Sequence, residues 1–318
     1  MGGKCCVPML PSFFAAFFFA FNGTCARHNL LANGPIKANL GRLIIAALVL
    51  GSFAHTLGHG FASASVGWFF LSGVIGMGLG DLGVYAALPR LGSRITVLMT
   101  QCLAAPLAAI GERLWLGTQL SLAQVLWGTL ILAGVVIAIT PSKSSPPRVS
   151  IRPIGFLFGF VAACGQGFGA LVSRKGVNVA DAAGEVAHNA AFGLTSAYQR
   201  ILAGLAFTSA WFLVLHLVGR FRARKAEIDY AKETGSAQGT GKFTWLLANG
   251  LSGPVLGVGC YQWALVTTPG GVVLPIVATA PLLAIPVAFW LEGDRPSRRA
   301  ILGGIVAVAG CIALTTAR

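Results

Sequence analysis

The feature that most constrains this 318-residue chain is a succession of long apolar runs separated by short polar or basic segments. A bilayer core about 30 Å thick requires about 20 apolar residues per helix, with about 17 as a lower limit. Applied along the chain, that length predicts an all-α polytopic membrane protein with ten transmembrane helices. The predicted spans are approximately 8–26, 39–55, 66–88, 95–111, 121–140, 153–172, 197–219, 243–266, 271–291 and 300–316.

The composition excludes a soluble globular protein. Charged residues make up 10% of the chain and apolar residues 55%, whereas a soluble domain carries about 25% charged residues on its surface. In a soluble chain the net charge of +14 would suggest nucleic-acid binding. The basic residues occur instead in short clusters between apolar runs, where lipid headgroups are the simpler partner. We therefore expect the lipid bilayer, and not nucleic acid, as the macromolecular partner.

The chain contains an internal duplication on either side of the Pro/Ser-rich segment 141–148. At the offset that relates Trp68 to Trp245, the third and eighth spans share glycines, leucines and alanines in order. The other matched residues are Gly73, Gly76, Leu79, Gly80, Ala87 and Leu88 with Gly250, Gly253, Leu256, Gly257, Ala264 and Leu265. We expect two five-span repeats at 1–141 and 153–318, joined by a linker at 142–152. Because five spans is an odd number, the second repeat inserts inverted.

Inverted repeats with a site near the midplane are the usual architecture of secondary transporters. No Walker A motif occurs in the sequence, so ATP-driven transport by this chain alone is not expected. Two alternatives stay open: an intramembrane enzyme acting on a lipid or peptide, and a non-transporting membrane scaffold. The enzyme hypothesis depends on Gly250-Leu-Ser-Gly253, which matches the Gly-x-Ser-Gly motif of intramembrane serine proteases. In those proteases the histidine base follows the serine, whereas His188 and His216 precede it here.

The sequence predicts no cofactor and no metal site. Its seven cysteines do not form the paired Cys-x₂-Cys pattern of a zinc site. His55 and His59 have the spacing that brings two imidazoles to one helical face, but no third ligand is evident nearby. A pair of loop histidines is the favoured interpretation.

Polar residues inside the spans mark the candidate site, because a charge at bilayer depth costs about 2.5–3.5 kcal/mol on insertion scales. Asp81 lies in the middle of the third span. It is interpreted either as a group that couples transport to a proton or cation, or as a structural carboxylate bonded to a neighbouring helix. Nothing in the sequence locates its counter-ion.

Uncharged polar and aromatic residues inside the spans are candidates for substrate binding or for interhelical hydrogen bonds. Tyr85 and Gln262 are related by the same offset as the matched glycines, which predicts equivalent faces of spans three and eight. The candidate substrate-binding residues are Tyr85, Gln262, Asn22, Gln101, Gln166, Asn249 and Trp263, with Tyr261 as a further intramembrane polar residue.

Each half also follows a common order of motifs. An arginine begins the second span of each half, in Arg42-Leu-Ile-Ile-Ala-Ala and Arg200-Ile-Leu-Ala. Glycine-rich third spans follow, GMGLGDLGVYAALPRLG and LGVGCYQWALVTTPGG, and then a fourth span that contains proline. The second half ends with an acidic loop, Leu291-Glu-Gly-Asp-Arg-Pro-Ser297, and the glycine-rich span GGIVAVAG. The first half has Thr118 at the corresponding acidic position, with Glu112 six residues earlier.

In these features the chain resembles, over nearly its whole length, the ten-span EamA-like members of the drug/metabolite transporter superfamily. The resemblance implies export or exchange of small metabolites, amino acids or drug-like molecules by alternating access. It also implies that the first four spans of each half line a central cavity, with spans five and ten outside. A proton is the candidate coupling ion. The substrate does not follow from family or fold.

The orientation in the membrane is predicted differently by two criteria. Most basic residues, including those of the segment 220–242, would lie on the side opposite the termini. The positive-inside rule places that side in the cytoplasm, whereas the resemblance implies cytoplasmic termini. We expect a multi-pass protein of the cytoplasmic membrane with 220–242 in the cytoplasm. The first run, 8–26, is alternatively a signal peptide with Lys4 before it, although the repeat requires this run as a span.

Overall fold

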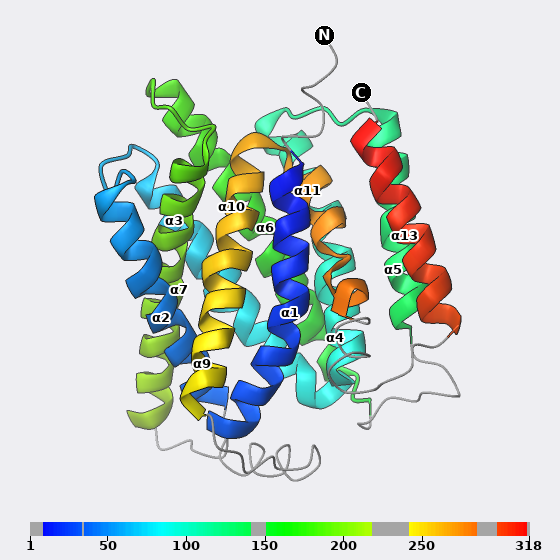
Figure 1. Ribbon diagram of the computed structural model, residues 1–318, viewed down its shortest axis with the longest axis horizontal. Coiled ribbons are helices and arrows are strands. Elements are labelled where there is room, and N and C mark those ends of the chain that lie inside the picture. The colour runs from blue at the N-terminus through cyan, green and yellow to red at the C-terminus, as the bar shows by residue number, and fades with distance from the viewer. Residues whose placement is uncertain (1–8, 34, 141–150, 218–241, 285–297, 317–318) are drawn as a thin grey trace.

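The computed structural model describes residues 9–33, 35–140, 151–217, 242–284 and 298–316 (Figure 1). These ranges consist of helices and short connections. The predicted linker 142–152 lies outside them except for its last two residues, and the segment 220–242 lies outside them except for Lys242.

The first half contains five α-helices and two π-helical segments, η1 and η2. Their bounds are α1 Leu10–Asn33, α2 Pro35–Thr56, α3 Val66–Gly73, η1 Val74–Gly80, α4 Asp81–Gly111, η2 Glu112–Leu116 and α5 Leu122–Ile139. The described part of the second half follows a similar order. Its elements are α6 Ile154–Ala182, α7 Ala190–Leu217, α9 Lys242–Gly250, η3 Leu251–Gly257, α10 Val258–Thr267, α11 Gly270–Val277 and α13 Arg298–Thr316.

Helix α4 supplies parts of two spans because it reverses direction along α6. In its first arm, Gly83 lies beside Ala162, and Leu91 lies beside Gly155 near the start of α6. The second arm returns along the same helix, where Ala108 lies beside Gly167. The segment formed by α3, η1 and the first arm therefore crosses the bundle once. The second arm, together with η2, crosses it again, as the separate spans predicted at 66–88 and 95–111 require.

The packing of the helices relates the two halves as inverted repeats. The second spans of the two halves, α2 and α7, pack on each other, and so do the fifth spans, α5 and α13. Helix α6 packs on α3, η1 and α4, while α1 packs in the corresponding way on α9, η3, α10 and α11. In Figure 1, α5 and α13 stand side by side at the edge of the bundle, outside the other helices.

The two π-helical segments η1 and η3 occupy equivalent positions of the two repeats. The offset that relates Trp68 to Trp245 also relates the first residue of η1 to that of η3, and Gly80 to Gly257. A π-helical segment inside an α-helix is uncommon and is frequently found at functional sites. The duplication predicted from the glycine pattern is therefore confirmed in backbone geometry.

The described helices match the predicted spans, with differences at their ends. Seven of them are long and apolar enough to cross a bilayer, and Leu10–Ala26 and Gly270–Ala284 are shorter apolar helices. Helix α6 continues to Ala182, ten residues beyond the predicted end of span six at 172, and α7 begins seven residues before the predicted 197. The added part of α6 includes Arg174, which is paired with Glu112 inside the bundle.

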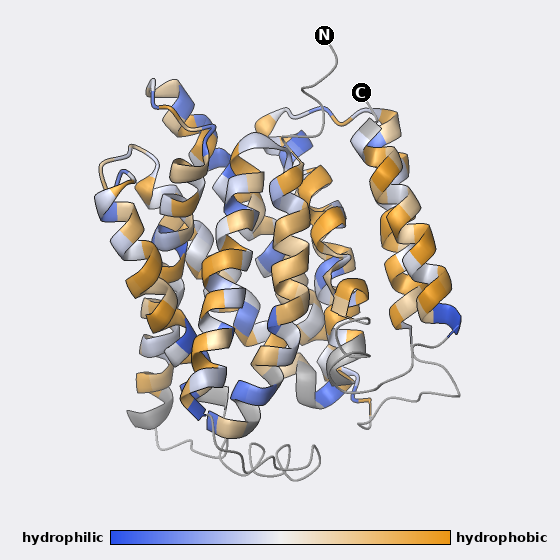
Figure 2. Cartoon of the chain, in the orientation of Figure 1, coloured by the Kyte–Doolittle hydropathy of each residue, from blue (hydrophilic) through white to orange (hydrophobic). Residues whose placement is uncertain are grey.

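The outer surface is apolar, as contact with lipid requires. Large hydrophobic side chains such as Leu48, Ile305 and Ile312 have 62–67% of their surface exposed. Hydrophobic residues line most of the length of the helices, and hydrophilic residues gather mainly near the ends (Figure 2). We call the end of the bundle where α1 begins and α13 ends the termini end, and the opposite end the basic end.

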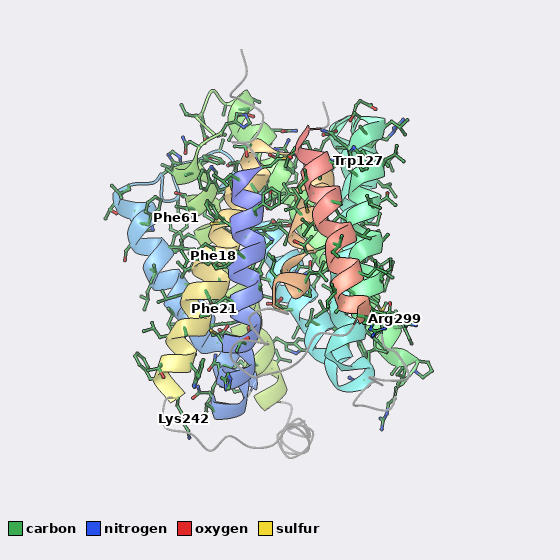
Figure 3. All side chains as sticks on the ribbon, turned by 45° about the vertical axis from the view of Figure 1, so that its right-hand side comes forward. Phe18, Phe21, Phe61, Trp127, Lys242 and Arg299 are labelled. Carbon is green, nitrogen blue, oxygen red and sulfur yellow. The ribbon has the colours of Figure 1, made fainter. Side chains whose placement is uncertain are left out.

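Exposed basic residues distinguish the basic end. Lys242 begins α9 there, and Arg298 and Arg299 begin α13. Figure 3 shows Lys242 and Arg299 near this end of the bundle, while Trp127 lies toward the other end. By the positive-inside rule this end is expected to face the cytoplasm, and the orientation stays a prediction.

Cysteine labelling tests the orientation. We expect the Lys242→Cys variant to resist a membrane-impermeant thiol reagent on intact cells and to react after the membrane is permeabilised. Val186→Cys, at an exposed position in the connection between α6 and α7 at the termini end, should react in intact cells. The background for both is a variant without native cysteines. The reverse pattern would show that the termini are cytoplasmic.

Candidate functional site

Arg42 is the counter-ion of Asp81. Asp81 begins α4 directly after η1, and α2 brings Arg42 opposite it, with 3.0 Å between Arg42 Nη2 and Asp81 Oδ2. Arg42 Nε also donates a hydrogen bond to Asn39 Oδ1 at 2.8 Å. The two paired side chains keep 18% and 19% of their surface exposed. The carboxylate predicted in the third span is thus neutralised by a residue of the second span.

Arg200 lies deeper, with 2% of its surface exposed. Its Nη1 donates a hydrogen bond to Gln262 Oε1, and its guanidinium carbon lies 5.8 Å from the centre of the Tyr261 ring. The guanidinium also interacts electrostatically with Asp81. Because Arg42 and Arg200 occupy matching positions of the two repeats, the inverted arrangement brings both arginines toward the same carboxylate.

Serine hydroxyls extend this polar cluster between four helices. Gln262 Nε2 donates to Ser173 Oγ at 3.3 Å and to Ser196 Oγ at 3.2 Å. Ser72 Oγ donates to Gly169 O at 2.6 Å and lies 2.8 Å from Ser173 Oγ. The network joins α3, α6, α7 and α10, and it gives the buried amide of Gln262 partners for both of its ends.

Glycines make room for the Arg200 guanidinium. A Cβ on Gly76 would lie 2.9 Å from Arg200 Nη2, and one on Gly165 would lie 2.4 Å from the Cα of Gly80. The backbones of η1 and α6 therefore approach so closely that a side chain at Gly165 could not fit. The Gly76-x-x-x-Gly80 motif acts here as a helix contact, and it also borders the buried charge.

Several buried polar atoms of this region have no hydrogen-bond partner among the described residues. They are Arg200 Nε, the Tyr261 hydroxyl and Asn249 Oδ1. Tyr261 is 6% exposed and Asn249 is 2% exposed. An unpaired buried donor or acceptor costs about 1–3 kcal/mol, and such groups in a native structure call for an explanation.

The other candidate residues lie at different places around this cluster. Asn22 on α1 accepts a hydrogen bond from Ser252 Oγ at 3.3 Å, and its amide lies against Gly253 in η3. Trp263 packs with the aromatic and aliphatic cluster of Phe69 and Phe192. The remaining candidates are Gln101, half-buried on the second arm of α4, Gln166, half-buried on α6, and Tyr85, whose side chain lies outside the described part.

Ser252 has partners that do not suit a nucleophile. Besides Asn22, its hydroxyl donates to Ala248 O at 2.7 Å. His188 is held elsewhere, with Nδ1 2.5 Å from Val266 O and Nε2 2.9 Å from Asp181. Among the described side chains, which do not include that of His216, no histidine bonds to Ser252.

A second buried ion pair lies near the termini end. Glu112, 1% exposed, lies 3.4 Å from Arg174 Nε. Its carboxylate accepts hydrogen bonds from the backbone N–H groups of Gly270 at 2.9 Å and Gly271 at 3.4 Å, and Arg174 Nη1 donates to Leu265 O at 2.7 Å. The carboxylate therefore caps the N-terminus of α11, where the helix dipole favours negative charge. It ties η2, α6, α10 and α11 together, and we call it the Glu112 lock.

The sequence analysis did not assign roles to the arginines. Arg42 and Arg200 served only to align the repeats, and Arg174 lies two residues beyond the predicted end of the sixth span. The sequence did indicate that these arginines need partners, because a charged side chain at membrane depth requires one. Which carboxylate or amide supplies that partner depends on helix packing and could not be read along the chain.

Comparison with known proteins agrees with the repeat architecture. Residues 8–140 and 153–316 each match the model of the EamA-like transporter family. The fold is similar to that of a solved crystal structure, with a TM-score of 0.67 and 16% sequence identity over 96% of both chains. A comparison with curated proteins found no match.

Removal of the charge from the Glu112 lock should destabilise the protein. The Glu112→Gln variant leaves Arg174 without its carboxylate, and loss of one partner of a buried pair costs about 3–5 kcal/mol. The matched control is Asp181→Asn, which affects an exposed pair and should cost about 1 kcal/mol or less. Unfolding of both purified variants in detergent measures the difference. Equal stabilities would mean that the lock does not hold the termini end together.

Proposed function

This chain belongs to the EamA-like transporter family, and we propose that it is a secondary transporter acting by alternating access in the cytoplasmic membrane. Its cargo is a small metabolite, an amino acid or a drug-like compound, moved in the export direction. The observation that carries the proposal is the central cluster of Arg42, Asp81, Arg200 and Gln262, formed by repeat-related helices. Retention of charged groups inside the membrane is costly and marks a functional pathway.

The inverted repeats support a single substrate site on their shared axis. The second spans α2 and α7 pack on each other, and the third and eighth spans contribute Asp81 and Gln262. Within this proposal Gln262 and Tyr85 contact substrate at related positions. Asn22, Gln101, Gln166, Asn249 and Trp263 are the further candidates around it.

Two charged clusters at different depths suit alternating access. The Glu112 lock joins η2, α6, α10 and α11 near the termini end. The Asp81–Arg42 pair lies nearer to the basic end and retains some exposure. Opening at the termini end requires the lock to separate, and the π-helical segments η1 and η3 are positions where both repeats can bend.

Asp81 is the proposed coupling group. A proton on its carboxylate would remove the charge that holds Arg42, so protonation changes the contact between α2 and α4. A secondary transporter needs such a group, whose protonation state differs between its two orientations. The pairing observed here supplies the group with a partner whose release can be transmitted to a second helix.

The Asp81→Asn variant tests the coupling. Asparagine keeps the size of the side chain but cannot carry the charge, so expression and folding should persist while gradient-driven transport falls at least about tenfold. Purified protein in proteoliposomes with an imposed pH gradient provides the measurement, with a screen of small metabolites as cargo. Asp181→Asn, far from the cluster, is the control. Unchanged transport with unchanged pH dependence would identify Asp81 as a structural residue only.

A cysteine at position 262 tests the position of the site. Gln262 is fully buried in this conformation, so Gln262→Cys should react with a small thiol reagent only when the transporter cycles, and transported cargo should slow the reaction. A cysteine at Ile312, exposed on the outer face of α13, is the control and should show no protection by cargo. Absence of both reactivity and protection at position 262 would place the site elsewhere.

A further inference from the structure

The charges of the described part of the chain do not balance at the central cluster. The acidic residues of the described part of the chain are Asp81, Glu112, Asp181 and Glu185. Asp81 pairs with Arg42 and Glu112 with Arg174, while Asp181 binds His188 and Glu185 accepts hydrogen bonds from the connection before α3. Within these ranges Arg200 has no carboxylate within ion-pair distance, although it is 2% exposed.

We propose that the substrate is a small monocarboxylate and that Arg200 binds its carboxylate group. This inference rests on the proposed transport function and names the substrate class of the same site. A buried, unpaired guanidinium is costly in a membrane interior, and an anionic ligand supplies the missing charge during each transport cycle.

The unpartnered atoms at the cluster are suited to a carboxylate. Arg200 Nε and the Tyr261 hydroxyl are both buried donors without an acceptor in the described structure. A carboxylate offers only acceptor oxygens and matches the planar fork of a guanidinium. The Tyr261 ring lies beside the same guanidinium, so one ligand can bind both residues.

The remaining contacts hold Arg200 in place for this purpose. Gln262 accepts from Nη1 and is itself fixed by Ser173 and Ser196. Gly76 lies next to Nη2 of Arg200 and has no side chain that could cover this nitrogen. One nitrogen of the guanidinium is therefore anchored, while Nε remains free to donate to a ligand. A ligand that meets an oriented donor loses less entropy on binding.

The sum of the charges favours a monoanion. Arg200, which has no carboxylate within ion-pair distance in the described part of the chain, carries one positive charge, which a monocarboxylate neutralises. A phosphate dianion would leave a net negative charge, an amine would be repelled by Arg200, and a neutral amide would leave the guanidinium unpaired. The same logic predicts discrimination between a carboxylate and the amide of identical shape.

Thermal unfolding of the purified full-length protein in detergent tests the substrate class without transport. The probes are acetate, butyrate and benzoate, each compared with acetamide, butyramide and benzamide at the same concentration and ionic strength. We expect at least one carboxylate to raise the melting temperature while its amide does not. The Arg200→Gln variant should require a carboxylate concentration at least about tenfold higher for the same rise in melting temperature. The Arg90→Gln variant should respond to carboxylate as the unmodified protein does. Arg90 bonds only to Ala86 O and stacks on Phe158 among its described contacts.

A second variant keeps the test decisive if Arg200→Gln does not fold. Tyr261→Phe removes a hydroxyl that has no protein partner, so the melting temperature without ligand should not fall, while the response to carboxylate should weaken several-fold. A hydroxyl with only a structural role would show the opposite pattern.

The proposal is overturned if no carboxylate exceeds its amide, or if Arg200→Gln and Tyr261→Phe both keep the full carboxylate response. Its failure is distinguishable from failure of the proposed function. Gradient-driven transport of a neutral or cationic compound in proteoliposomes would retain the transporter while excluding the monocarboxylate. Carboxylate binding without any transport would retain the site while excluding the transporter.

Discussion

The need to pair charged side chains inside an apolar bundle determines which helices meet at two levels of this protein. At the centre, Asp81 and Arg42 join α4 to α2, and Arg200 joins α7 to α10 through Gln262. Near the termini end, Glu112 joins η2 to α6 and to the start of α11. In lipid an unpaired charge has no water to bind, so these contacts restrict which helices can lie next to each other.

The two repeats share a backbone plan but differ in their polar chemistry. The π-helical segments η1 and η3 and the arginines of the second spans are related by the duplication. Asp81 has no acidic counterpart, because Val258 occupies the equivalent position. The inverted arrangement therefore brings two arginines to one carboxylate, and this inequality produces the excess positive charge at the centre.

Close backbone packing is the condition that lets this cluster form. Gly165 on α6 lies against Gly80 at the end of η1, where a Cβ would clash with the opposing backbone. Small residues at helix crossings allow such approach in membranes. The approach brings Ser72 of α3 and Ser173 of α6 within hydrogen-bond distance of each other, and Ser173 in turn accepts a hydrogen bond from the amide of Gln262, which orients Arg200.

The sequence by itself determined the membrane class, the position of most spans and the inverted duplication. These follow from runs of apolar residues and from glycines repeated at a fixed offset, which are local properties readable along the chain. It also singled out Asp81 and Gln262, since polar residues are rare at bilayer depth. It ended the sixth span at 172, whereas α6 continues to Ala182 and carries Arg174 paired with Glu112. The partners of Asp81, Glu112 and Arg200 were decided only by the tertiary structure. Each of these contacts joins residues of different helices, and the rotation and depth at which two helices pack depend on many side chains together.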